Sequence, residues 1–111
     1  MSERVTVIAS KDEFQAQTCD GVVLVDFFAT WCGPCQRQMP ILESVAQKAG
    51  DTVRVCKVNI ENLPDIAGLF GVERIPTLVL LKNGKEVQRF EGIQQESGLL
   101  IAISAISEHE A

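Results

Sequence analysis

Residues 31–35 read Trp31-Cys32-Gly33-Pro34-Cys35, and the segments on either side indicate what this pentapeptide can do. A nearly continuous apolar run over 22–29 precedes it, and a segment with helical character over 36–49 follows it. A Cys-x-x-Cys pair at a strand-to-helix junction is typical of a dithiol that is reversibly oxidised to a disulfide.

The spacing of the two cysteines suits reversible disulfide formation. In the first turn of a helix, residues i and i+3 lie on one face, so the two sulfurs can bond with little backbone movement. We expect Cys32 at the helix N-terminus, where free N–H groups and the helix dipole favour the thiolate that attacks a disulfide. Cys35, one turn further on, would then attack the mixed disulfide and release the partner.

The two residues between the cysteines fit the same chemistry. Pro34 has no N–H and suits the start of a helix, where that donor has no partner, and it narrows the geometries open to the pair. Gly33 allows a bulky partner to come close. A structural zinc site is the alternative for a Cys-x-x-Cys motif, but it usually needs a second matched pair. The other cysteines, Cys19 and Cys56, stand alone and far apart.

Composition indicates a globular protein. The chain has 111 residues, 46% apolar and 23% charged, and we expect one domain over residues 1–111. A net charge of −5 without a basic cluster argues against a nucleic-acid partner.

The start lacks the pattern of a secretion signal, and no apolar run reaches the length of a membrane span. We therefore expect a cytoplasmic protein with no membrane partner. Disulfide frameworks are rare in the cytoplasm, so one close cysteine pair there indicates catalysis.

Hydrophobic periodicity predicts the element order β-α-β-α-β-α-β-β-α. The expected strands are 5–9, 22–29, 53–59, 78–81 and 86–90, and the expected helices are 11–18, 36–49, 64–70 and 95–107. The first connections are crossovers that suit parallel pairing, whereas Asn83-Gly84 predicts a hairpin between the last two strands. The result is an α/β fold with a central mixed five-stranded sheet flanked by four α-helices.

Residue type also predicts which side chains face solvent. The 36–49 helix should bury its apolar residues and expose a polar face, which consists of Gln36, Arg37, Gln38, Gln47 and Lys48. Free cysteines are commonly small buried hydrophobes, so we expect both Cys19 and Cys56 in the core.

Asp26 interrupts the apolar run that leads into the cysteine pair. Burial there should raise the pKa of its carboxyl group. One interpretation is a proton acceptor or donor for Cys35, and the other is a carboxylate fixed by a structural hydrogen bond. Lys57 lies on the next strand, and the alternation leaves open whether it points inward as a partner of Asp26 or outward as a surface lysine.

Two further residues allow alternative interpretations. Pro76 precedes an apolar strand, where a cis peptide bond and an ordinary strand-starting proline are both consistent with the residues. The only histidine, His109, lies in a polar tail, which is a poor place for the positioned histidine of a cysteine hydrolase.

Taken together, these residues resemble the thioredoxin family over nearly the whole chain. The residues that carry the resemblance are Asp26, the 31–35 pentapeptide, Pro40, Lys57-Val58-Asn59, Ile75-Pro76-Thr77, Lys82-Asn83-Gly84 and Gly92. The resemblance implies the thioredoxin fold and a monomeric protein-disulfide reductase that binds no cofactor or metal. It implies that Cys32 is the attacking thiolate and Cys35 the resolving thiol, with Asp26 assisting Cys35 and Lys57 beside Asp26.

The same resemblance implies a cis-proline at Pro76, packed against the disulfide, and a flat apolar surface where partners dock. The matching surface residues are Trp31, Ile60, Gly71, Val72, Ile75, Gly92 and Ile93, with Arg74 beside them. Electrons would come from a thioredoxin reductase that is itself supplied by NADPH, and the substrates would be proteins with disulfides.

Departures from the family pattern concern partner choice. Phe28 stands where a further tryptophan is usual, and Glu73, Arg74 and Glu91 put charge around the expected docking surface. A binding subunit or holdase that uses this surface without redox turnover is the alternative function. An oxidant or isomerase is a third possibility, which the Gly33-Pro34 pair disfavours.

Overall fold

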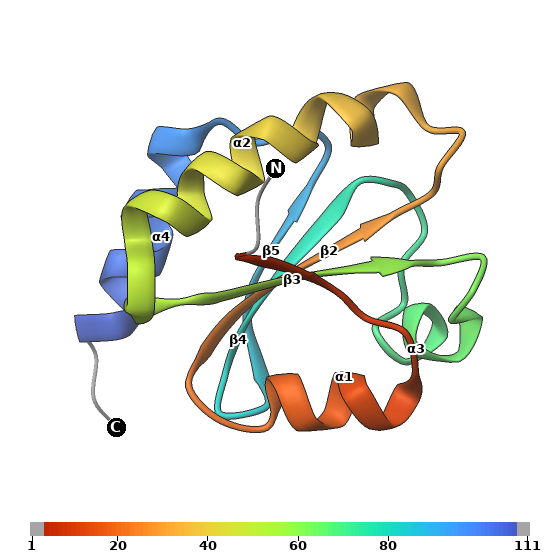
Figure 1. The fold of residues 1–111 in the computed structure, drawn as a ribbon, viewed down its shortest axis with the longest axis horizontal. Coiled ribbons are helices and arrows are strands. Elements are labelled where there is room, and N and C mark those ends of the chain that lie inside the picture. The colour runs from red at the N-terminus through yellow and green to blue at the C-terminus, as the bar shows by residue number, and fades with distance from the viewer. Residues whose placement is uncertain (1–3, 109–111) are drawn as a thin grey trace.

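A five-stranded mixed sheet is the centre of the computed structural model, which describes residues 4–108 (Figure 1). The strands are β1 (Val5–Val7), β2 (Val22–Phe28), β3 (Arg54–Asn59), β4 (Thr77–Lys82) and β5 (Lys85–Glu91). Their order in the sheet is β1-β3-β2-β4-β5. β3 pairs in parallel with both β1 and β2, whereas β4 pairs antiparallel with β2 and β5. The predicted mixed sheet is therefore confirmed, with β5 at an edge.

Helices cover both faces of this sheet, as Figure 1 shows. The α-helices are α1 (Lys11–Thr18), α2 (Gly33–Ala49), α3 (Pro64–Leu69) and α4 (Glu96–Glu108), and a short 3-10 turn, η1 (Gly50–Thr52), follows α2. α1 and α3 lie on one face, and α2 and α4 lie on the other. Within residues 4–108, no helix combines the length and apolar character needed to cross a membrane.

The apolar run of β2 is buried on both faces because each alternation meets a different core. Val23, Val25 and Phe27 pack on the α1–α3 side, whereas Leu24 packs on the α2–α4 side, and all four are fully buried. Strict alternation along a strand places Asp26 on the same side as Leu24. The sheet thus points the only charged side chain of β2 toward the layer that contains α2.

Local signals fix the element ends. Ser10 caps α1, and its Oγ accepts the Glu13 N–H at 3.0 Å, as predicted for a serine followed three residues later by a glutamate. The Glu13 carboxylate accepts the N–H of Ala9 at 2.7 Å. Asn83 and Gly84 both have positive φ, 52° and 84°, which is the geometry of a two-residue hairpin turn.

Two side chains differ in burial from what their residue types predict. Gln38 is fully buried rather than exposed, because the helix turns it toward the loop before α4, where its amide is hydrogen-bonded. Cys19 is exposed rather than buried, because it follows the last residue of α1, at the surface turn that leads to β2. Cys56 is buried in the core of the α1–α3 side, as predicted.

Candidate active site

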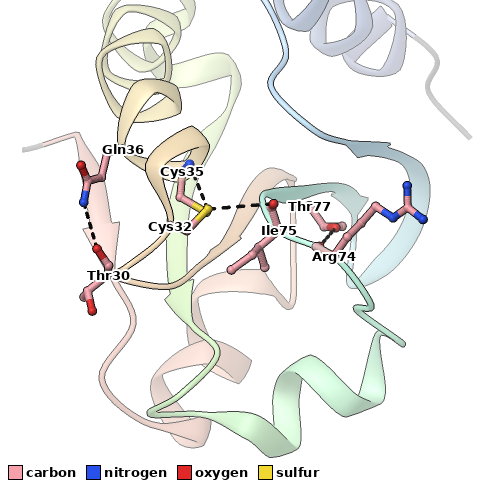
Figure 2. The surroundings of a disulfide bond; sticks show 7 residues. All are labelled: Thr30, Cys32, Cys35, Gln36, Arg74, Ile75 and Thr77. Atoms are coloured by element: carbon pink, nitrogen blue, oxygen red, sulfur yellow. Dashed lines mark hydrogen bonds between the residues drawn. A yellow bond between two sulfur atoms is a disulfide. The ribbon is translucent and has the colours of Figure 1, made fainter.

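A disulfide joins Cys32 and Cys35 at the beginning of α2 (Figure 2). Cys32 has extended backbone angles and is the N-cap of the helix, which begins one residue later at Gly33. Its Sγ accepts the Cys35 N–H at 3.2 Å, and the two Cα atoms are 5.2 Å apart. Pro34 occupies the first turn, where backbone N–H groups have no helical partner and a missing donor costs nothing.

The two sulfur-bearing residues differ in depth. Cys32 is 5% exposed and Cys35 is 1% exposed. Both pack with Ala29 in a small apolar cluster that is bordered by the half-buried side chains of Ile60 and Ile75. Both cysteines are therefore buried, and Cys35 is slightly the less exposed of the two.

A segment from a distant part of the chain lies against the disulfide. The Ile75–Pro76 peptide bond is cis, which resolves the alternative that the residues alone left open. The Ile75 carbonyl oxygen faces Cys32 Sγ in Figure 2, and the two atoms are 4.0 Å apart. Thr77 Oγ1 donates a hydrogen bond to the Arg74 carbonyl, and the Pro76 carbonyl accepts the Gly92 N–H at 2.8 Å. The segment beside the sulfurs is thus tied at both ends.

Asp26 is fully buried, and burial raises the pKa of its carboxyl group from 3.8 to about 7, with the charge of Lys57 acting in the opposite direction. Within residues 4–108, neither oxygen of this carboxyl group has a hydrogen-bond partner. Desolvation penalises the charged form, so the dominant cause is the removal of water. A carboxyl group in this state exchanges its proton near neutral pH.

Lys57 points to the same layer as Asp26 because the two residues are register partners on the parallel strands β3 and β2. Its Nζ lies 3.4 Å from Met39 Sδ and 5.6 Å from the centre of the Phe28 ring. The inward alternative from the sequence is therefore the one observed. The ammonium group acts on Asp26 through its field rather than through a hydrogen bond.

The predicted docking residues fall into groups around the disulfide. Trp31 is 68% exposed, and its Nε1 donates to Glu61 Oε2 at 3.0 Å. Ile60 and Ile75 border the cysteines directly, as described above. Val72 is half-buried and packs against the core of the α1–α3 side, and it is not one of the side chains that border the cysteines.

The remaining predicted residues lie in turns and at the surface. Gly71 and Gly92 have positive φ values of 61° and 86°, a conformation that glycine adopts without strain. Ile93 is half-buried. Arg74 is exposed, and its Nε lies 3.8 Å from Glu91 Oε1, so two of the three charges that depart from the family pattern face each other.

Two residues near the site, Gln38 and Glu61, and one contact, between Arg74 and Glu91, are not predicted from the sequence. Gln38 carried a usable signal, because Cys35, Gln38 and Leu42 share one helical face, and two of these are residues of core type. Glu61, the partner of Trp31, and the pairing of Glu91 with Arg74 carried none, because both contacts join separate segments. His109 lies outside the described residues.

The described part of the chain contains no cluster of metal-ligating side chains that could complete a zinc site with the two cysteines. Within residues 4–108, no group of three or more histidine, cysteine, aspartate or glutamate side chains is arranged to hold a metal ion. The two cysteines of the motif are bonded to each other.

A disulfide at a helix N-terminus, beside a cis-proline in a mixed sheet, defines a dithiol–disulfide oxidoreductase. The Thioredoxin family model matches residues 5–105, and the chain belongs to the thioredoxin family. The pair Cys32–Cys35 is its redox-active disulfide, and the activity is reduction of protein disulfides without a bound cofactor.

Individual relatives agree with this assignment. Thioredoxin of Chlamydia muridarum is 44% identical over 103 residues, which cover 93% of this chain and 97% of the relative. Thioredoxin Y, chloroplastic, of Oryza sativa subsp. japonica is 45% identical over 86 residues, 78% of this chain and 51% of the relative, so this chain matches about half of that protein. A solved mutant thioredoxin from Halobacterium salinarum has a TM-score of 0.89 and 32% identity, covering 100% of this chain and 98% of that chain.

Proposed function

We propose that Cys32 is the nucleophile and Cys35 the resolving thiol in the reduction of protein disulfides. In the reduced protein, the Cys32 thiolate attacks one sulfur of the substrate disulfide, forms a mixed disulfide and releases the other substrate sulfur as a thiolate. Cys35 then loses its proton and attacks Cys32 Sγ, which releases the second substrate thiolate and forms the Cys32–Cys35 disulfide. Two electrons pass from the dithiol to the substrate.

The position of Cys32 supports this division of roles. As the N-cap of α2 it lies at the positive end of the helix dipole, and its sulfur already accepts the Cys35 N–H at 3.2 Å. Both features stabilise negative charge on sulfur. Cys35 is deeper, at 1% exposure, and is the better placed of the two to remain protonated until the mixed disulfide forms.

Asp26 is our candidate for the group that accepts the Cys35 proton. It lies on the α2 side of β2, and its pKa of about 7 lets it take and return a proton near neutral pH. Lys57, its register partner, lowers the pKa of Asp26 and so keeps part of the population ionised.

Partners are proposed to dock on a surface around the disulfide, which we call the docking surface. It consists of Trp31, Ile60, Gly71, Val72, Arg74, Ile75, Gly92 and Ile93. The exposed indole of Trp31 and the half-buried side chains of Ile60 and Ile75 supply apolar contact area next to the sulfurs. Gly33 and Pro34 are exposed and leave the approach to Cys32 open. Together with Pro76 they constrain the geometry of the cysteine pair, so we assign these three residues to tuning of its redox potential.

The oxidised protein needs a source of electrons, for which we propose a thioredoxin reductase supplied by NADPH. We further propose that the chain acts as a monomer in the cytoplasm on disulfide-containing proteins, and that neither nucleic acids nor membranes are partners. The net charge of −5 supports the exclusion of nucleic acid. A binding subunit or holdase that uses the docking surface without turnover is the alternative outcome of the following test.

The proposal rests on the disulfide at the start of α2, and trapping of the mixed disulfide between Cys32 and a substrate tests it. With NADPH, thioredoxin reductase and a protein disulfide, wild type should turn over rapidly, and Cys32→Ser should be inactive. Cys35→Ser should accumulate a covalent complex with the substrate through Cys32. Cys56→Ser, a matched change at a buried thiol in the core of the α1–α3 side, should behave like wild type. Wild-type turnover by Cys35→Ser would contradict the assigned roles.

A further inference from the structure

Gln38 makes an unusual contact for a polar helical residue. Its side chain is fully buried, and both ends of its amide bind the backbone of one residue in the connection between β5 and α4. Gln38 Nε2 donates to the Gln94 carbonyl at 3.0 Å, and Gln38 Oε1 accepts the Gln94 N–H at 2.8 Å. A buried amide is costly unless it is paired, and here the side chain and the backbone satisfy each other.

The residue that Gln38 binds is part of a tied segment. The Gln94 side chain donates back to the Gly92 carbonyl at 3.2 Å and to the Glu91 carbonyl at 3.4 Å. The Gly92 N–H in turn donates to the Pro76 carbonyl at 2.8 Å. One continuous set of hydrogen bonds therefore runs from α2, through residues 92–94, to the cis-proline segment that lies 4.0 Å from Cys32 Sγ.

This set of hydrogen bonds connects α2, which carries the cysteine pair at its start, to residues 92–94, two of which belong to the docking surface. Gln38 is one turn after Cys35 on the same helix, so its position relative to the sulfurs is set by helix geometry. Gly92 and Ile93 belong to the docking surface and come from a connection that turns through a positive φ at Gly92. Without the Gln38 contact, the Gln94 N–H and carbonyl would lose their partners, and the segment would keep its tie to Pro76 alone.

We propose that Gln38 is a positioning residue for partner docking, which fixes residues 92–94 relative to α2 and the cysteine pair at its start. The inference rests on the docking surface proposed above. A protein substrate must fit its backbone and side chains against this segment while its disulfide meets Cys32, whereas a small disulfide reagent needs only the sulfur. The contribution of Gln38 is therefore to binding of large partners and not to the exchange chemistry.

Gln38→Met tests the proposal, because methionine has nearly the same length and lacks both hydrogen-bonding groups. We expect KM for a protein disulfide to rise roughly three- to tenfold, which is what the net loss of one or two hydrogen bonds predicts, with kcat unchanged. Reduction of a small disulfide reagent should stay at the wild-type rate. Hydrogen exchange of the Gln94 amide should accelerate. Gln47→Met, the same change at an exposed position of α2, is the matched control and should leave all four readouts unchanged.

A second variant gives a rescue that a merely space-filling role would not show. A protonated glutamic acid can accept the Gln94 N–H and donate to its carbonyl, whereas an ionised glutamate repels that carbonyl. Gln38→Glu should therefore bind a protein disulfide with near wild-type KM at low pH and lose affinity as pH rises, relative to the same pH series for wild type. A KM that is unchanged in Gln38→Met, or equal losses toward protein and small disulfides, would overturn the proposal.

Ile93→Glu separates this inference from the docking surface on which it rests. If the surface is correct, Ile93→Glu raises KM for the protein disulfide. A raised KM in Ile93→Glu with a wild-type KM in Gln38→Met would refute the role of Gln38 alone. Wild-type KM in both variants would refute the docking surface as well.

Discussion

Asp26 and Lys57 are register partners on adjacent parallel strands, and no hydrogen bond joins their side chains. The lysine ammonium instead lies 3.4 Å from Met39 Sδ and 5.6 Å from the centre of the Phe28 ring. The Met39 sulfur and the Phe28 ring contact the ammonium group, so Lys57 acts on the Asp26 carboxyl group through its charge and does not form an ion pair with it. The pKa of Asp26 is therefore about 7, because burial raises it strongly and the charge of Lys57 lowers it by a smaller amount.

Removal of the Lys57 charge should shift the ionisation of Asp26 in a defined direction. Because Lys57 lowers the pKa of Asp26, Lys57→Met should raise that pKa above its value of about 7. An NMR titration of the Asp26 carboxyl carbon in the disulfide form measures this directly. Lys85→Met, at an exposed site in β5, serves as the control and should leave the titration unchanged. A lower pKa in Lys57→Met would contradict the assigned interaction.

The same carboxyl group makes stability depend on pH. Its folded pKa of about 7 lies above the unperturbed 3.8, so the favourable contribution of the protonated form is fully present below 3.8 and is lost as pH rises through about 7. Asp26→Asn cannot ionise and avoids this loss. We expect the variant to exceed wild type in free energy of unfolding by several kcal/mol at pH 8.5 in the disulfide form, with the gain disappearing toward pH 4.

Urea unfolding at a series of pH values checks this expectation. The difference between the two midpoints should grow steadily across the interval between the two pKa values. A difference that does not vary with pH would show that the effect of the substitution is one of packing. Asp51→Asn, at an exposed residue of η1, controls for the general effect of removing a charge.

The two cysteines outside the motif should react at very different rates. Burial is the main reason that the pKa of Cys56 is raised to about 11, with smaller effects of Arg54, which lowers it, and Glu13, which raises it. Cys19 is exposed. Alkylation of the native disulfide form near pH 8 should therefore modify Cys19 and leave Cys56 intact until the chain is unfolded. Peptide mass spectrometry after timed alkylation measures both, and equal labelling would show that the core opens readily.

The Arg74–Glu91 pair should affect partner choice more than stability. Both side chains are well exposed and their nearest atoms are 3.8 Å apart, so Glu91→Gln should change the free energy of unfolding by less than about 0.5 kcal/mol. The variant leaves Arg74 without its acidic neighbour. KM should fall for a substrate with acidic residues beside its disulfide and rise for one with basic residues, and both effects should shrink at high salt. Equal KM changes for the two substrates would argue against an electrostatic role.

Much of the fold was predictable because its signals are local. The apolar run before the motif, the Ser10 cap and the Asn83-Gly84 turn each act within a few residues, and each appears in the structure as expected. The cysteine spacing likewise predicted both the helix start and the disulfide.

The errors came from residue type taken without position. Because glutamine is polar, residue type predicts an exposed position for Gln38, but the connection before α4 offers its side chain two backbone partners. Free cysteines are usually buried, so residue type predicts a core position for Cys19, but this residue follows the last residue of a surface helix. Contacts such as Trp31 with Glu61 join residues on different segments, and periodicity within one segment contains no information about them.

Trp31 is the single tryptophan of the chain, and the sequence contains no tyrosine. Near-ultraviolet fluorescence of the molecule therefore arises from one indole, next to Cys32 and anchored to Glu61 at 3.0 Å. The native chain carries its own optical probe at the place where electrons are exchanged, and stopped-flow emission can follow each encounter without an attached dye.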